Sequence, residues 1–423
     1  IPIFVAFLTI GLLALLPQRT NAQNEYFFPA GVTFDQNIPS PEEFLGYPIG
    51  TFATRNDRIV SYFQELARLS DRATYQEIGQ TYERRPMPVL TVTTPENHAR
   101  LEEIQTRHLA ASRADGDVEA AADLPVIVHL GYGVHGNETS SSEAAMLTAY
   151  WLVAGTGEVD TYLEEGVFFV EPNLNPDGRD RHTWWANLNR AEPFVADPLD
   201  REHNEVWPGG RTNHYWFDLN RDWLPLVNPE SRARIDWHQS WRPNVVTDFH
   251  EMGASSTYFF EPSEPVGSWN PLLPESIYTD ITMRFADDWA AALDSLGSLY
   301  FTKEVYDNSY PGYGSTYPNF LGGLGLVFDY LARVLATFWS SRLLSESPRL
   351  VIRVGLAFLV LGLSGDRVLA QTPPTAAQYD EQARAYFRAG AFDLAAKEFE
   401  KAFELEKKAT RLFNAALAYE KAE

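Results

Sequence analysis

A histidine and a glutamate stand three residues apart in the stretch "VIVHLGYGVHGNETSSSEAAM" (126–146), as His135 and Glu138. They follow an apolar run and a glycine-containing turn and begin a segment with helical spacing, so both side chains would lie on one helix face. An imidazole and a carboxylate placed in this way can bind one metal ion. An isolated pair is more often a helix-start glutamate beside an incidental histidine, so a metal site needs a third ligand.

His250 is the best candidate for the third ligand. It ends the apolar run "PNVVTDFH" (243–250), and two strands of one sheet that end in histidine would bring both rings to the same edge. His129 lies inside "VIVHL" and is predicted to be a core histidine. The remaining histidines lie in polar or loop contexts and are not expected to be ligands: His98, His108, His182, His203, His214 and His238. Because the chain has no cysteine, any metal ligand must be His, Asp or Glu.

The elements that would position these residues alternate along the chain. Short runs rich in Val, Ile, Phe and Leu at 124–130, 166–172, 243–250 and 323–329 predict strands, and helical spacing at 56–70 and 141–155 predicts helices. This alternation predicts an α/β sheet covered by helices. Ligands bind such sheets at the carboxyl ends of the strands, where His135 and His250 are expected.

The overall composition narrows the class of partner. The chain has 423 residues, of which 45% are hydrophobic, and its formal net charge is −23 at pH 7. A strongly negative protein is repelled by nucleic acid phosphates and by anionic membrane surfaces. We therefore expect no nucleic acid partner.

Two further segments add to the motifs at His135, Glu138 and His250: "EPNLNPDGRDRHTWWANLNR" (171–190) and "FDLNRDW" (217–223). With the His-Gly-Asn-Glu motif at 135–138, they make residues 53–330 resemble the zinc metallocarboxypeptidase family, in its A/B and N/E branches. The resemblance implies a mixed β-sheet flanked by helices and one Zn²⁺ ion. It also implies hydrolysis of C-terminal peptide bonds, with peptide or protein C-termini as the substrate.

The resemblance implies a role for residues of the metal site. His135, Glu138 and His250 would be the zinc ligands, and Asp218 would accept a hydrogen bond from the far nitrogen of His135 and so orient its ring. Arg190, at the family's spacing after the Asn-Pro-Asp-Gly turn, would stabilise the oxyanion.

The resemblance also implies the residues that hold the substrate. Asn220 and Arg221 would bind its terminal carboxylate. Tyr310 would close over the substrate; Tyr313 is the alternative, but its spacing to Gly314 fits less well. Thr316 would lie near the position that sets side-chain specificity.

Asp329 departs from the family, which has glutamate as the general base at this position. Aspartate keeps the carboxylate but retracts it, and a misplacement of about 1 Å can lower the rate on the order of 10²-fold. The sequence therefore leaves a second hypothesis open, a catalytically impaired carboxypeptidase-like protein that binds peptides or acts as a scaffold.

The two ends of the chain suggest export and a separate module. Residues 1–22 resemble a signal peptide, followed by an N-terminal extension at 23–52. Residues 375–423 resemble truncated tetratricopeptide repeats, a short all-α segment that would bind a protein partner.

The junction at 331–374 contains a second apolar segment with a signal-peptide pattern. We expect a periplasmic or extracellular protein, with membrane tethering through 350–363 as an alternative to cleavage. A joining of two reading frames around 330–350 is a further interpretation of this pattern.

Overall fold

The computed structural model describes residues 27–28 and 32–331, except 114, 196, 198, 253–256, 264–267, 296–297 and 305–307, and also 383, 395, 397 and 399. The predicted signal peptide, internal apolar segment and repeats lie outside the described residues, apart from those four isolated positions. Within the described ranges, none of the helices combines the length and the apolar character needed to span a membrane.

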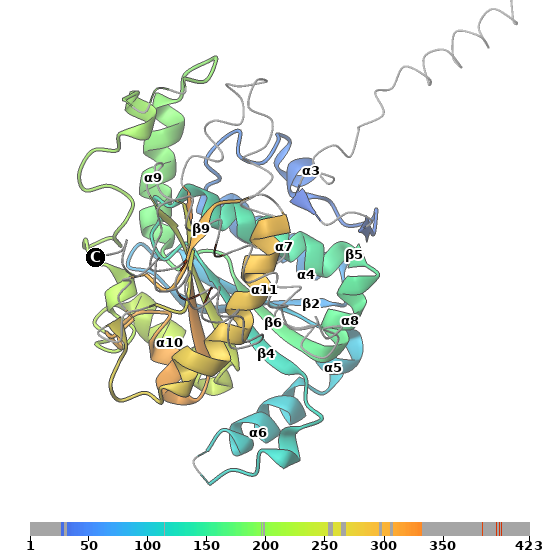
Figure 1. Cartoon of the computed structure of the whole chain (residues 1–423). Helices are drawn as coiled ribbons and strands as arrows, with labels where there is room; N and C mark the ends of the chain where they lie inside the picture. The colour runs from blue at the N-terminus through green and yellow to red at the C-terminus, as the bar shows by residue number, and fades with distance from the viewer. Residues whose placement is uncertain are drawn as a thin grey trace, which may run out of the picture. The chain divides into compact units, whose positions relative to one another are not determined.

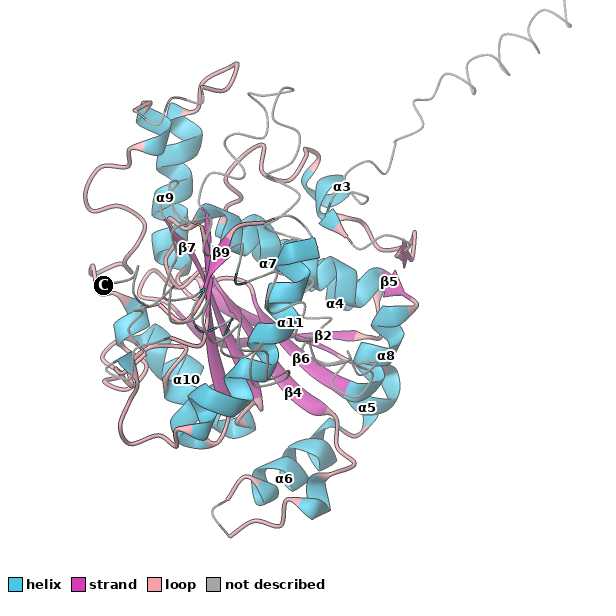
Figure 2. Ribbon diagram, viewed as in Figure 1, coloured by secondary structure: helices cyan, strands magenta, loops and turns pink. Residues whose placement is uncertain are grey.

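The centre of the fold is an eight-stranded mixed sheet (Figures 1 and 2). Its strands, in spatial order, are β2 (Ala73–Gln80), β3 (Pro86–Val92), β6 (Gly166–Glu171), β4 (Val126–Tyr132), β7 (Val245–Met252), β10 (Leu324–Leu331), β8 (Tyr258–Phe260) and β9 (Tyr300–Phe301). The middle strands β6, β4, β7 and β10 are parallel, whereas β2, β3 and β8 pair in an antiparallel sense with their inner neighbours. The predicted α/β class with a mixed sheet is confirmed for this part of the chain.

Helices cover both faces of this sheet. One face packs against α4 (Asn56–Leu69), α7 (Thr139–Ala154), α8 (Glu158–Glu165) and α11 (Thr282–Ser295), and the other against α6 (Leu101–Ala111) and α10 (Pro229–Trp241). The other regular elements are α3 (Pro41–Leu45), α5 (Pro95–Ala99), α9 (Pro176–Asn189), the small ribbon of β1 (Thr33–Phe34) and β5 (Gly155–Thr156), and short turns η1 (Glu119–Ala121), η2 (Arg201–His203), η3 (Leu219–Arg221), η5 (Ile277–Ile281) and η6 (Tyr317–Leu321).

Strand β4 shows how alternate residues pack on the two helix-covered faces of the sheet. Val128, Leu130 and Tyr132 pack on the α7 side, and Ile127 packs on the α10 side. His129 is fully buried on that second side, where its Nε2 lies 3.1 Å from the Glu171 carboxylate. The prediction of a core histidine is therefore confirmed.

The parallel strands end at a common edge. His250 lies near the carboxyl end of β7, directly opposite Asp329 of β10, and His135 follows β4 by three residues. Gly136 allows the loop after β4 to pack against the start of α9, because a Cβ at this position would lie 2.1 Å from the Arg179 nitrogen. The carboxyl edge of the sheet therefore gathers the predicted chemical groups.

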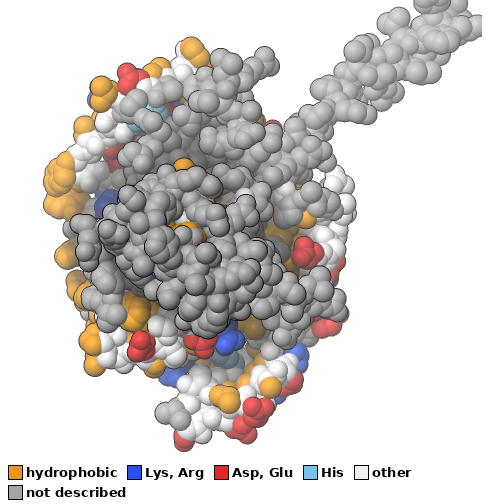
Figure 3. Space-filling model, viewed as in Figure 1, with side chains coloured by type: hydrophobic (Ala, Val, Ile, Leu, Met, Phe, Trp, Pro, Cys, Tyr) orange, Lys and Arg blue, Asp and Glu red, His pale blue; other side chains and the backbone are white. Residues whose placement is uncertain are grey.

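The long connection between α9 and α10 runs beside this edge. Most of the exposed large hydrophobic side chains of the described residues belong to it and to α9, and hydrophobic side chains gather along one margin of the space-filling view (Figure 3). Because these side chains are exposed, they add little packing that would hold the connection in place. Hydrogen bonds hold part of it, such as those that Arg181 donates to the carbonyls of Gly209, Thr212 and Asn213.

A buried ion pair joins α9 to α7. The Arg179 guanidinium donates to both carboxylate oxygens of Glu143 at 2.7 Å, and both side chains are 1% exposed. Arg179 also donates to the carbonyl of Thr54, and Glu143 accepts from the Thr54 N–H. This pair fixes the element that follows the Asn-Pro-Asp-Gly turn.

We expect Arg179→Met to lower the free energy of unfolding by about 3–5 kcal/mol, because it leaves the buried Glu143 carboxylate without its cation. Urea denaturation would measure the change. Arg284→Met is the control, since the pair that Arg284 forms with Asp280 in the described part of the chain is exposed, and its loss should change stability by less than about 0.5 kcal/mol. Equal effects of the two substitutions would contradict the structural role of the pair.

Candidate active site

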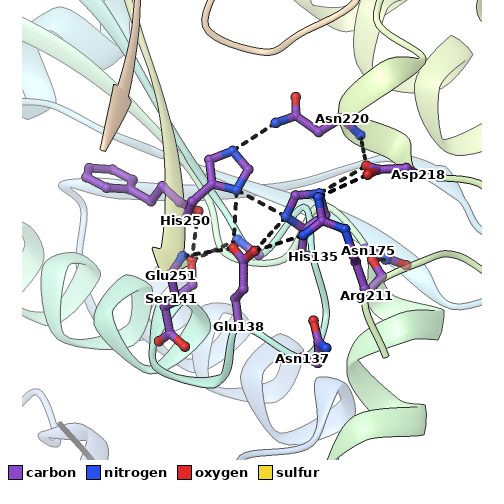
Figure 4. Close-up of polar contacts among 12 residues, drawn as sticks. His135, Asn137, Glu138, Ser141, Asn175, Arg211, Asp218, Asn220, His250 and Glu251 are labelled. Atoms are coloured by element: carbon purple, nitrogen blue, oxygen red, sulfur yellow. Dashed lines mark hydrogen bonds and ion pairs between the residues drawn. The ribbon is translucent and has the colours of Figure 1, made fainter. Parts of the chain in front are cut away.

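Three buried side chains meet at the carboxyl edge of the sheet (Figure 4). His135 comes from the loop after β4, Glu138 immediately precedes α7, and His250 belongs to β7. Nδ1 of His135 lies 2.6 Å from Oε1 of Glu138, and Nδ1 of His250 lies 3.2 Å from Oε2 of Glu138. The structure thus brings together all three predicted ligands, with both imidazoles presenting the same ring nitrogen.

The arrangement can hold one metal ion, since the three ligand atoms lie within 4.8 Å of one another. Two imidazoles and a carboxylate are a donor set that suits zinc. A cavity of about 420 Å³ opens beside them and is lined by all three side chains. That opening provides the free side that a catalytic metal requires.

Glu138 is held in the ionised form that a ligand needs. Burial by itself raises the pKa of this carboxyl, but the neighbouring His135 and His250 rings lower the pKa well below its ordinary value. The backbone N–H of Glu251 also donates to Oε2 of Glu138 at 3.0 Å. The carboxylate is therefore both charged and fixed in direction.

Asp218 lies behind His135, as expected. Its Oδ1 is 3.0 Å from Nε2 of His135 and also accepts the N–H of Asn220 at 2.9 Å. Burial opposes ionisation of Asp218, but the hydrogen bond to His135 and the charge of Arg211 lower the pKa of this carboxyl overall. An ionised acceptor on Nε2 keeps the Nδ1 lone pair of His135 available for a metal.

The predicted carboxylate-binding pair lines the cavity. Arg221 lies over the ring of Tyr313 at 4.4 Å, and Oδ1 of Asn220 accepts the N–H of Gly314 at 2.8 Å. Tyr313 lines the cavity too, whereas Tyr310 packs against Tyr313 and donates its hydroxyl to the Arg221 carbonyl at 3.1 Å. The two tyrosines therefore support the position of Arg221.

Thr316 is not among the residues that line the cavity. It is 1% exposed, and its hydroxyl donates to the Asn308 carbonyl at 3.1 Å. The neighbouring Ser315 lines the cavity instead. Because Thr316 begins a turn that packs into the core, its side chain is used for structure, and its predicted part in specificity stays a prediction.

Arg190 lies apart from the residues that line the cavity. Its guanidinium packs over Phe52 at 4.4 Å and over Phe194 at 4.1 Å, and it pairs with Glu192 at 3.2 Å. The oxyanion role that spacing predicts for Arg190 is thus still a prediction, and these contacts do not support it.

Arg211 is a cavity residue that sequence reasoning missed. Its guanidinium lies 3.1 Å from Oδ2 of Asp218 and 3.6 Å from Oε1 of Glu138, and its side chain is 47% exposed toward solvent. The available signal was its position seven residues before Asp218, on the connection that also carries Asn220. A spacing counted from the Asn-Pro-Asp-Gly turn could not reveal how this connection folds back.

Asp329 and Glu251 also line the cavity. Asp329 is 4% exposed and stands opposite His250 on the adjacent strand. Glu251 was not predicted; its carboxylate accepts the N–H of Ser140 at 2.6 Å, and burial followed by the charge of Glu138 raises its pKa well above the ordinary value. Glu251 anchors the start of α7, the helix that Glu138 precedes.

Comparison with known proteins finds carboxypeptidases among the curated relatives of this chain. Carboxypeptidase 2 of Trichophyton rubrum is 25% identical over 215 residues, which are 50% of this chain and 31% of that protein. The probable carboxypeptidase 2 of Trichophyton verrucosum is 25% identical over 215 residues, covering 50% of this chain and 33% of its own length. The chain therefore spans about a third of these relatives.

Solved structures share the fold. A metallo-carboxypeptidase from Burkholderia cenocepacia superposes with a TM-score of 0.50 at 19% identity, over 72% of this chain and 67% of that one. Carboxypeptidase A from Helicoverpa armigera gives a TM-score of 0.50 at 16% identity, over 78% and 77% of the two chains. The family model for zinc carboxypeptidases matches residues 59–317, well over half of the chain and all of the predicted metal ligands. The chain therefore belongs to the zinc carboxypeptidase family.

Proposed function

We propose that this chain is a zinc-dependent metallocarboxypeptidase that hydrolyses the C-terminal peptide bond of peptides or proteins. The observation that carries the proposal is the buried group of His135, Glu138 and His250 at one side of a cavity that also presents Arg211 and Arg221. Two fixed cations beside a metal site suit a substrate that is anionic at its end and becomes anionic at the reacting carbonyl.

Asn220 and Arg221 would bind the C-terminal carboxylate of the substrate and so select its C-terminus. A guanidinium can form two parallel charge-assisted hydrogen bonds with a carboxylate, and the contact with Tyr313 holds Arg221 for this purpose. An internal peptide segment has no carboxylate to offer. Binding at this pair would therefore limit cleavage to the C-terminus.

Asp329 would move the protons of the reaction. His135, Glu138 and His250 would hold a zinc ion, which would supply a Lewis acid for the scissile carbonyl and for the water. Asp329 then accepts a proton from the attacking water and returns it to the leaving amine. Its place opposite His250 supports this role.

Arg211 would face the negative charge that develops on the carbonyl oxygen. Its contacts with Asp218 and Glu138 fix the guanidinium beside the metal ligands before substrate arrives. A preorganised cation stabilises the transition state without further reorganisation. We therefore assign this role to Arg211 in preference to Arg190.

Peptide binding without cleavage, the second hypothesis from the sequence, is not favoured by any contact of the described site. Export, closure of Tyr310 over the substrate and a protein partner for residues 375–423 are proposals that rest on the sequence pattern.

We expect the full chain to release C-terminal amino acids from a panel of peptides. This release should stop when a zinc chelator is added and should return when zinc is restored. Amidated versions of the same peptides are the control and should be cut poorly, because they lack the terminal carboxylate. Chromatography of the released amino acids measures the reaction. Bound zinc without release from any peptide would reject the hydrolytic function.

The two arginines can be separated by substitution. We expect Arg211→Gln to lower kcat by about 10²–10³-fold, the usual loss for one oxyanion donor, while Arg190→Gln stays within about threefold of the unmodified chain. Steady-state kinetics with one peptide substrate measures both. A large loss in Arg190→Gln alone would return the role to Arg190.

Asp329→Asn tests the proposed base. It should lower kcat by about 10²–10⁴-fold, because an amide cannot accept the proton, while zinc content stays unchanged. Metal analysis and kinetics on the same sample measure the two effects. Activity that survives this substitution would show that another group acts as the base.

A further inference from the structure

The two ring nitrogens of His250 have different neighbours. Nδ1 lies 3.1 Å from Nδ1 of His135 and 3.2 Å from Oε2 of Glu138, on the side where a metal would bind. Nε2 lies 2.8 Å from Nδ2 of Asn220 and 3.0 Å from Oδ2 of Asp248. A neutral imidazole has one N–H donor and one lone pair, so these contacts cannot all be favourable at once.

The orientation of the Asn220 amide is fixed independently. Its oxygen accepts the N–H of Gly314 at 2.8 Å, so its NH₂ group points toward Nε2 of His250 (Figure 4). An NH₂ group only donates, so this contact requires the lone pair of His250 to be on Nε2. The ring hydrogen is then on Nδ1, facing Oε2 of Glu138.

A metal bound at Nδ1 reverses this arrangement. It uses the Nδ1 lone pair, so the ring hydrogen must be on Nε2. That nitrogen then needs an acceptor, and the NH₂ group of Asn220 cannot provide one. The Asp248 carboxylate can, because its Oδ2 already lies 3.0 Å away.

The position of Asp248 on β7 places its carboxylate beside the His250 ring. It stands two residues before His250 on β7, so both side chains lie on the same face of the strand, and it is 2% exposed. Its Oδ2 has no hydrogen-bond partner in the described part of the chain, because the 3.0 Å approach to Nε2 of His250 is an ion-pair contact without hydrogen-bond geometry. Gly314 leaves room for it, since a Cβ there would lie 2.7 Å from this oxygen.

We propose that Asp248 is a positioning residue that accepts the Nε2 hydrogen of His250 when metal binds, and that this exchange releases the Asn220 NH₂ group toward the substrate carboxylate. The inference rests on the proposed zinc function and deepens it. Asp218 would serve His135 and Asp248 would serve His250, so each imidazole ligand has its own carboxylate. Metal binding would then prepare the substrate-binding amide.

The test is zinc affinity of the full chain, measured by competition with a fluorescent zinc chelator. We expect Asp248→Asn to weaken zinc binding by about 10–100-fold, the usual effect of losing such a partner. Asp222→Asn is the matched control, because Asp222 is also a buried aspartate, and within the described residues its carboxylate accepts hydrogen bonds from Val227 and Asn228 and has no contact with a metal ligand. It should lose stability with no loss of zinc affinity.

Asn220→Ala gives a second readout that does not depend on the folding of Asp248→Asn. Removing the competing NH₂ group should leave zinc affinity unchanged or raise it, while KM for a peptide rises. A loss of zinc affinity in Asn220→Ala would make Asn220 the orienting partner of His250 and overturn the inference. Equal zinc affinity in Asp248→Asn and Asp222→Asn would also overturn it, with the proposed function intact, whereas failure of the unmodified chain to bind zinc would overturn both.

Discussion

The parallel hydrogen bonding of β7 with β4 on one side and β10 on the other determines where His135, His250 and Asp329 lie. In parallel register, Asp329 of β10 stands beside His250 of β7, and the chain leaving β4 reaches His135 at the same edge. A shift of β10 by one residue would turn Asp329 to the opposite face of the sheet. The chemistry of the site therefore depends on sheet register before it depends on any side-chain contact.

Buried charge is the second constraint on the site. Glu138, Asp218, Asp248 and Glu251 bring four carboxyl groups close together. The basic groups nearest to them are the imidazoles of His135 and His250 and the partly exposed guanidiniums of Arg211 and Arg221. Ionised carboxylates are costly to bury without cations, and the raised pKa of Glu251 reflects this cost. A divalent ion at the three ligands would add the missing positive charge, which is a physical reason for this cluster to bind metal tightly.

The sequence predicted what local pattern determines. His135, Glu138 and His250 lie at strand ends that hydrophobic runs mark clearly, and Asp218, Asn220 and Arg221 share one short turn, so their relative positions follow from a few residues. The mixed sheet itself followed from family resemblance, since alternation of elements alone does not give strand direction. The place of Arg211 in the cavity was not predicted, because Arg211 belongs to a connection whose path is set by contacts with α9 and not by its own periodicity.

Gly314 links the two halves of the site in a way that sequence spacing could not express. Its N–H donates to the Asn220 side-chain oxygen, and its missing side chain leaves space for Asp248, so one residue orients the Asn220 amide and leaves room for the carboxylate beside His250. Any side chain at this position would meet Asp248 and the Trp223 ring at once. The requirement for glycine here thus arises from close approach of three segments, β7, η3 and the loop before η6. A sequence pattern describes each of these segments, but only the folded chain shows that they need the same space.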